Sequence, residues 1–293
     1  MRFRHALLIA LLGLGAGIAL LAQRPFKEWD AIEYNHNIPI PDDFNTKTDW
    51  VRARLRYPDI WGYPFKQLYF KDSAGVTREF PGYWTMDYPR SDRHLLQGVQ
   101  RLTRINTRLA EQIVDLDGTD EVYNWPMMYA VEVGHWLLPD DQAKQLGEFL
   151  MRGGFLMVDD FHGNVEWRQF VYSINRALPG REIVDIPDSD PIFHTIYDLD
   201  ERFQVPGAQI FDTGKEYEAG SDKDIKGDPD FTAGRPPHWR GIYDDKGRVI
   251  VAICHNMDLG DAWEWSDDPR YSEKWASLAY RVAMNYFVYD LTH

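Results

Sequence analysis

Histidine and aspartate side chains gather just after three apolar segments of the chain, at residues 127–133, 155–158 and 248–254. The candidate site residues that follow these segments are His135, Asp159, Asp160, His162, His255, Asp258 and Asp261. If the three segments are neighbouring strands of one sheet, these side chains converge on a common crevice. The pattern therefore predicts a ligand-binding site at the ends of three strands.

One form of this site is a metal centre, because imidazole and carboxylate groups together suit zinc, manganese or iron. A hydrolase would use such an ion to activate water. The residues available for it are His135, Asp159, Asp160, His162, Glu166 and His255, with Glu166 as a ligand or a general base. The structural alternative is that the two aspartates cap the next helix or bind loop amides, while His162 and His255 pack against aromatic rings. The spacing Asp-Asp-Phe-His is not a strong metal signature, so the sequence identifies no cofactor.

The elements that position these residues follow from local signals. Pro139 and the two aspartates after it are typical of a helix start, and Gly153-Gly154 is typical of a helix end. The continuous apolar run at 155–158 indicates a strand covered on both faces. Residues 129–162 therefore predict a strand, a helix and a second strand whose polar end lies where an α/β sheet binds its ligand.

Hydrophobic periodicity extends this pattern over the rest of the chain. Further strands are predicted at 50–57, where arginines share one face, at 182–186 and at 248–254, and a short hairpin at 67–80. Further helices are predicted at 91–105, 165–178 and 273–289. Strands and helices alternate, which predicts a mostly parallel, doubly wound α/β sheet with helices on both faces.

The first residues predict export from the cytoplasm. Arg2 and Arg4 precede an uncharged apolar run at residues 6–22, which indicates a signal peptide or a retained membrane anchor. The run of 17 residues spans roughly 25 Å, slightly short of a comfortable membrane helix, and an anchor is slightly favoured. We expect a segment 1–22 of this kind, a linker at 23–48 and one α/β domain at 49–293. The domain would lie in the periplasm, anchored to the inner membrane or free.

Charge and cysteine content narrow the possible partners. The chain has 32 basic and 46 acidic residues, so its net charge of −14 repels phosphate backbones and anionic lipid headgroups. We therefore expect no nucleic-acid partner, and membrane contact through the N-terminal helix only. The single cysteine, Cys254, excludes an internal disulfide and is expected to be an inert, buried thiol. A charged stretch within 221–234 is predicted to be a surface insertion.

Several long motifs resemble the bacterial domain-of-unknown-function family 4159. They are MDYPRSDRHLLQGVQRLT, YNWPMMYAVEVGHW, LMRGGFLMVDDFHG, DPIFHTIYDLDERFQVPG and PHWRGIYDDKGRVIVAICHNMDLGDAWEW. The resemblance runs from about Trp50 to the C-terminus. It implies a flavodoxin-like fold related to class I glutamine amidotransferases and frequent occurrence on membrane-tethered envelope proteins, and it brings no established activity.

The same resemblance argues against glutaminase chemistry. Amidotransferases of that fold place a nucleophilic cysteine on the sharp turn after a central strand, whereas the equivalent turn here carries Asp159-Asp160-Phe161-His162. Cys254 belongs to a different strand, and adjacent strand residues such as Cys254 and His255 point to opposite faces. We therefore expect a noncatalytic module that binds envelope proteins or a small-molecule ligand. The alternatives are the metal-dependent hydrolase and a carbohydrate-binding protein that stacks sugars on Trp239, Trp263 and Trp265.

Overall fold

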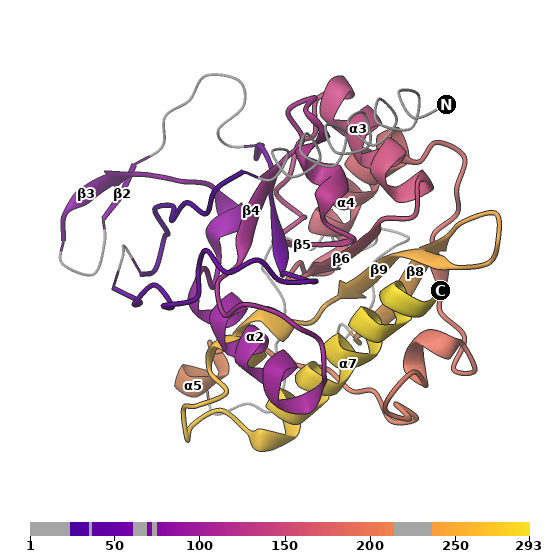
Figure 1. Ribbon diagram of the computed structural model, residues 1–293. Coiled ribbons are helices and arrows are strands. Elements are labelled where there is room, and N and C mark those ends of the chain that lie inside the picture. Colours follow the sequence, from indigo (N-terminus) through magenta and orange to yellow (C-terminus); the bar gives the residue numbers. More distant parts are fainter. Residues whose placement is uncertain (1–23, 35–36, 61–68, 72–74, 214–235) are drawn as a thin grey trace, which may run out of the picture.

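The computed structural model describes residues 24–34, 37–60, 69–71, 75–213 and 236–293. Within these residues a seven-stranded sheet has the order β4-β1-β5-β6-β9-β8-β7 (Figure 1). Its strands are β1 (Ala53–Arg56), β4 (Gln112–Asp115), β5 (Met127–Val131), β6 (Phe155–Asp159), β7 (Val184–Asp185), β8 (His238–Tyr243) and β9 (Val249–His255). The first five strands of this order pair in parallel, whereas β8 pairs antiparallel with both β9 and β7. The predicted α/β class with a mostly parallel sheet is confirmed.

Helices cover both faces of the sheet. They are α2 (Arg90–Leu102), α3 (Asp140–Met151), α4 (Gly163–Ala177), α5 (Ile210–Thr213), α6 (Leu259–Glu264) and α7 (Glu273–Thr292), with the 3-10 turns η1 (Tyr83–Thr85), η2 (Asp120–Asn124) and η3 (Pro191–Phe193). Figure 1 shows α3 and α4 on one side of the sheet and α2 with α7 on the other. Gly153 has a φ of 112° and Gly154 donates to the Phe149 carbonyl, so the predicted glycine pair does end α3.

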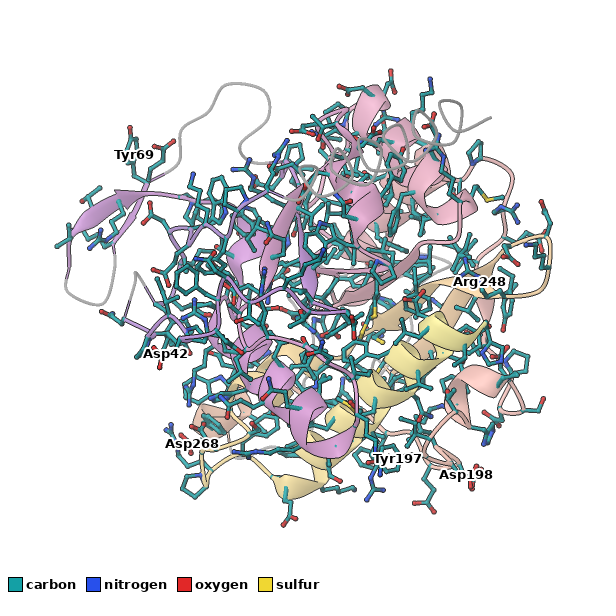
Figure 2. All side chains as sticks on the ribbon, in the orientation of Figure 1. Asp42, Tyr69, Tyr197, Asp198, Arg248 and Asp268 are labelled. Atoms are coloured by element: carbon teal, nitrogen blue, oxygen red, sulfur yellow. The ribbon has the colours of Figure 1, made fainter. Side chains whose placement is uncertain are left out.

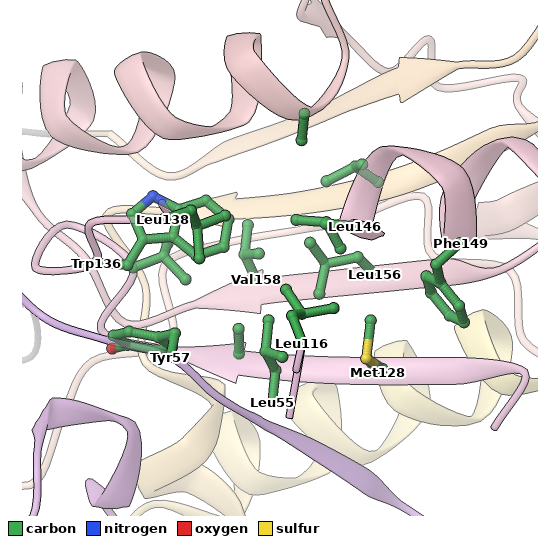
Figure 3. Close-up of a cluster of buried hydrophobic side chains, with 14 of the residues drawn as sticks. Leu55, Tyr57, Leu116, Met128, Trp136, Leu138, Leu146, Phe149, Leu156 and Val158 are labelled. Carbon is green, nitrogen blue, oxygen red and sulfur yellow. The ribbon is translucent and has the colours of Figure 1, made fainter. Parts of the chain in front are cut away.

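The two apolar cores follow the alternation of side chains along the strands. In β5, Met128 and Ala130 face the core under α3 and α4, whereas Tyr129 and Val131 face the core under α2 and α7. Figure 3 shows Met128 and Leu156 of the strands against Leu146 and Phe149 of α3. Both faces of the central strands are buried, which is why the apolar segments are continuous rather than alternating.

The arginine-bearing face of β1 lies inside the protein. Arg52 and Arg54 are buried, and both bond through Nε to the carboxylate of Asp92 in α2. Arg54 Nη1 also donates to the backbone carbonyls of Trp84 and Met86, at 3.1 and 3.0 Å. The Arg52 guanidinium stacks over the Tyr129 ring, 4.0 Å from its centroid. Asp92 is the shared counter-ion of both guanidiniums, and the backbone carbonyls and the Tyr129 ring lie against the remaining positive charge.

Two peripheral segments complete the fold. The predicted hairpin is present as β2 (Tyr69–Lys71) and β3 (Thr77–Glu79), paired antiparallel, and Figure 2 shows Tyr69 on its outer part. The segment predicted as a linker packs on the domain: the Trp29 ring lies edge-on to Trp84, and the Leu109 amide donates to Asp43.

None of the described helices is both apolar enough and long enough to span a bilayer. The predicted N-terminal segment 1–22 and the predicted insertion 221–234 lie outside the described residues.

Two strands, β4 and β8, and two short helices, α5 and α6, were not predicted from the sequence. The strand β4 has only four residues, two of them polar, and β8 was interpreted as an aromatic loop. The short helix α6 is capped by Asp258, whose side chain accepts a hydrogen bond from the Asp261 amide. The four-residue β4 and the short helices α5 and α6 carry too few periodic positions to be recognised locally.

Candidate functional site

The three strands that carry the candidate residues are direct neighbours in the sheet. The strand β6 lies between β5 and β9, and both pairings are parallel, with Val131 opposite Asp159 and Val158 opposite Ile253. Their carboxyl ends therefore meet at one edge. We refer to this edge, with the seven candidate residues, as the strand-end site.

All three strands leave this edge through the same backbone conformation. The residues that directly follow β5, β6 and β9 are Glu132, Asp160 and Asn256, with φ values of 52°, 55° and 61°. Among the described residues Asp87, at 59°, is the only other non-glycine residue with positive φ. The left-handed region costs a non-glycine residue about 1–2 kcal/mol, and such strain clusters at functional sites.

The strand-end site is covered by the chain itself. Six of the seven candidate residues are less than 9% exposed, and Asp261 is partly exposed. A segment before α5 lies over the edge: the Asp258 amide donates to the Val205 carbonyl, and the Gln204 side chain donates to the Asn256 carbonyl. A ligand that reaches the buried candidates must therefore displace this segment or bind at Asp261.

The histidines of the site make packing and capping contacts. His135 Nδ1 lies 2.9 Å from Glu132 Oε2, and its ring stacks on Tyr83 at 4.0 Å. The His162 amide, at the start of α4, donates to Glu166 Oε2 at 2.6 Å. Glu166 therefore accepts from the backbone at the helix N-terminus, where a carboxylate is favourable.

His255 lies in an aromatic environment. Its ring packs against Phe161 and Trp167, with centroids 4.9 and 4.8 Å away, and its Nε2 lies 3.1 Å from the Gly163 carbonyl. Burial lowers the pKa of His255 well below its ordinary value, so the imidazole is neutral at neutral pH. Packing against aromatic rings was the structural alternative for this residue, and the geometry matches it.

Asp159 holds the start of α6. Its Oδ2 accepts from the amides of Leu259 and Gly260 at 2.8 and 2.9 Å and from the Tyr129 hydroxyl at 3.2 Å. Burial raises the pKa of Asp159 to about 7 despite these donors. The alternative in which this aspartate binds backbone amides is thus observed, although the amides belong to α6 rather than to the helix that follows it in sequence.

A family model described as a domain of unknown function (DUF4159) matches residues 74–291, most of the chain. The chain belongs to the DUF4159 family. The matched region includes β5, β6 and β9, and therefore the whole strand-end site, whereas β1 precedes it. No curated protein matches the sequence.

The DUF4159 domain does not assemble the predicted mixed histidine and aspartate metal set in its described part. Among the described residues, the groups of three or more potential ligand side chains whose donor atoms lie within 4.8 Å of one another contain only acids. They are Glu33, Asp87 and Glu264, and Asp87, Asp258 and Asp261. His135 bonds to Glu132, and His255 packs among aromatic rings.

Three of these acids were missed by the sequence analysis. Glu33 lies in the segment predicted as a linker, Asp87 in the turn before α2, and Glu264 in the aromatic stretch of α6. None follows a strand, so the rule that led to the strand-end site does not reach them. The only local signal was the Asp87-Tyr-Pro sequence, which is typical of a turn.

A separate pocket of about 500 Å³ lies elsewhere on the DUF4159 domain. It is lined by residues of α2 and α7, including His94, Arg101 and Tyr280, together with Ser266 and Asp267. None of the seven candidate residues lines it. We therefore assign it no part in the strand-end site.

Proposed function

We propose that this protein is an exported or membrane-tethered envelope protein whose DUF4159 domain is a noncatalytic ligand- or protein-binding module. The proposal includes a flavodoxin-like scaffold related to class I glutamine amidotransferases. The observation that carries it is the turn after β6. Asp160, with φ of 55°, follows β6 directly, and the resemblance to amidotransferases implies a nucleophilic cysteine at this turn, where this chain has an aspartate.

Cys254 offers no substitute nucleophile. It is fully buried in β9 on the face that packs under α7, and burial raises the pKa of its thiol well above the ordinary value. The ring of the adjacent His255 packs against Phe161, on the opposite face of the sheet. Thiol and imidazole therefore do not form the nucleophile–base pair that acyl transfer needs.

Export is supported by the sequence order of charge and apolar residues alone. Arg2 and Arg4 precede the apolar run 6–22, which favours a cytoplasmic N-terminus and a domain on the other side of the membrane. Partners are then envelope proteins or a small molecule. The net charge of −14 opposes nucleic acid as a partner.

Two of the three tryptophans in the sugar-binding alternative are buried. Trp263 is fully buried, with its ring against Tyr129 and the Arg52 guanidinium, and Trp239 is 8% exposed. Only Trp265 retains partial exposure. A sugar needs an accessible ring face, so the buried rings serve the core instead.

The proposal is tested by measuring ammonia release from glutamine with the full-length protein and with Cys254→Ala. We expect both proteins to release ammonia at the rate of a protein-free control. In parallel, a maleimide should label Cys254 only after denaturation, because the native thiol is buried and protonated. Ammonia release that disappears in Cys254→Ala would overturn the noncatalytic assignment.

A further inference from the structure

Two groups of three carboxylates share Asp87 and include two acids of the strand-end site, and we call these five residues the acid cluster. They are Glu33, Asp87, Asp258, Asp261 and Glu264. Asp87 belongs to both three-acid groups, so it lies at the centre, with Glu33 and Glu264 on one side and Asp258 and Asp261 on the other. Like charges at such separations repel strongly in a partly buried site.

Buried oxygens of the cluster lack protein donors. Asp87 is 2% exposed, and its Oδ2 accepts no hydrogen bond from the described residues. Glu264 is 1% exposed, and neither of its carboxylate oxygens accepts one within the same residues. A buried charged oxygen without a donor costs several kcal/mol unless another positive group satisfies it.

Asp87 Oδ2 and the carboxylates of Asp258 and Asp261 lie against two glycines. A side chain built at Gly260, in the first turn of α6, would overlap Asp87 Oδ2, and one built at Gly207 would meet Asp258 Oδ2 and Asp261 Oδ2. The absence of side chains at both glycines leaves room for these three carboxylates, which have oxygen atoms within 4.8 Å of one another.

No base balances the cluster in the described part of the chain. Arg54 is the cation that acts on both Asp87 and Glu33, yet its hydrogen bonds go to Asp92, Ser91 and backbone carbonyls. Burial, with repulsion from neighbouring acids, raises the pKa of Glu264 to about 9. The cluster must therefore gain either protons or a cation.

We propose that the acid cluster binds a hard divalent cation of the Ca²⁺, Mg²⁺ or Mn²⁺ class, with Asp87 as the central ligand. Carboxylate oxygens in a set without nitrogen or sulfur are the donors that these ions prefer. A divalent ion satisfies the donor-free oxygens of Asp87 and Glu264 and removes the repulsion between the acids. This site differs from the zinc-type histidine set that was one alternative from the sequence, and it stands whether or not the domain is catalytic.

The cation would also hold the segment around Glu33 against the rest of the fold. Although Glu33 is exposed as a residue, its Oε2 accepts from the Asp87 amide at 2.9 Å, so its carboxylate points toward the cluster. Glu33 lies in the segment that leads from the N-terminus into the fold. A bound ion would therefore hold this segment against the turn before α2 and the first turn of α6.

The test uses full-length protein stripped with a chelator and then titrated separately with Ca²⁺, Mg²⁺ and Mn²⁺. Isothermal titration calorimetry and thermal melting are the readouts. We expect at least one ion to bind stoichiometrically and to raise the melting temperature by about 5 °C or more at roughly 100-fold excess over its dissociation constant.

Two variants test whether the ion binds at the acid cluster. Asp87→Asn keeps a residue type that tolerates positive φ, and Asp258→Asn keeps a side-chain oxygen that can cap α6. Each should fold, as checked by circular dichroism, and bind the ion roughly 100-fold more weakly, because a charged ligand is lost. Glu121→Gln is the matched control: Glu121 is buried and bonded to Trp125, outside the cluster, so binding should be unchanged.

Two results would overturn the proposal. The first is the absence of binding and of any melting shift with all three ions up to about 10 mM, well above the range of weak extracellular calcium sites. The second is binding that persists unchanged in both Asp87→Asn and Asp258→Asn, which would place the ion elsewhere. Either result leaves the glutaminase test unaffected.

Discussion

At the scale of single residues, Asp92 is the acid on which the buried charges of β1 depend. It is fully buried and bonds to Arg52 and Arg54 together, and Arg54 Nε lies 2.8 Å from its Oδ2. Two guanidiniums against one carboxylate leave an excess positive charge inside the protein. The backbone carbonyls and the Tyr129 ring around them share that charge.

We expect Asp92→Asn to lower the free energy of unfolding by about 3–5 kcal/mol, because it leaves two buried cations without a counter-ion. Urea denaturation followed by circular dichroism measures this. The control is Asp42→Asn at an exposed, peripheral position (Figure 2), where the change should be within about 0.5 kcal/mol. If Asp92→Asn lowers the free energy of unfolding no more than Asp42→Asn does, the ion pairs of Asp92 do not contribute to stability.

At the scale of elements, the strand-end site depends on how α3 and α4 cross, because α4 starts at the site. Gly147 of α3 lies directly against the end of α4: a side chain there would overlap the backbone carbonyl of Ala177. Backbone cannot move aside as a flexible side chain can. Glycine at this position allows α3 and α4 to approach closely, although glycine is a poor helix former.

Gly147→Ala should reduce stability by about 1–3 kcal/mol, because steric overlap with Ala177 exceeds the gain of about 1 kcal/mol that alanine brings to a helix interior. Lys144→Ala, on the exposed side of the same helix, reports the propensity effect alone and should change stability little. Thermal melting of both variants measures these changes in stability. An increase in melting temperature for Gly147→Ala would mean that the helices can separate without cost.

At the scale of the whole molecule, the excess of acids makes stability depend on pH. Asp290 near the C-terminal end of α7 shows the effect away from the acid cluster: its Oδ2 is buried without a partner among the described residues, and burial raises its pKa to about 7. The folded protein therefore holds a proton that the unfolded chain releases near its ordinary pKa of 3.8. Stability from this group is present at low pH and is lost as pH rises to about 7.

Asp290→Asn removes this titration. Relative to the unaltered protein, the variant should gain about 1–2 kcal/mol of stability between about pH 5 and about pH 8, because only the unaltered protein must bury a charge at the higher pH. Urea denaturation at both pH values measures the difference. Asp42→Asn should show the pH profile of the unaltered protein, and identical profiles for Asp290→Asn would contradict a buried, proton-binding carboxyl.

Much of the sheet could be predicted from the sequence because its signals are local. The apolar segments that became β5, β6 and β9, and the Pro139 and Gly153-Gly154 limits of α3, each follow from side-chain burial or backbone freedom over a few residues. The topology rules for α/β sheets then made neighbouring strands the expected arrangement. The strands β4 and β8 contain no comparable run of apolar residues and were missed.

By itself, the sequence determined the central strands β5, β6 and β9 and the long helices, and that polar residues stand at the ends of these three strands. Only the tertiary structure decided what those residues contact: Asp159 binds the start of α6, and His255 packs among aromatic rings. It also brought Glu33 to Asp87, 54 positions further along the chain, where they join the acids of α6. The physical reason is that periodicity reports the burial of a segment from its neighbours in sequence, whereas the partner of each polar group is set by packing between distant segments.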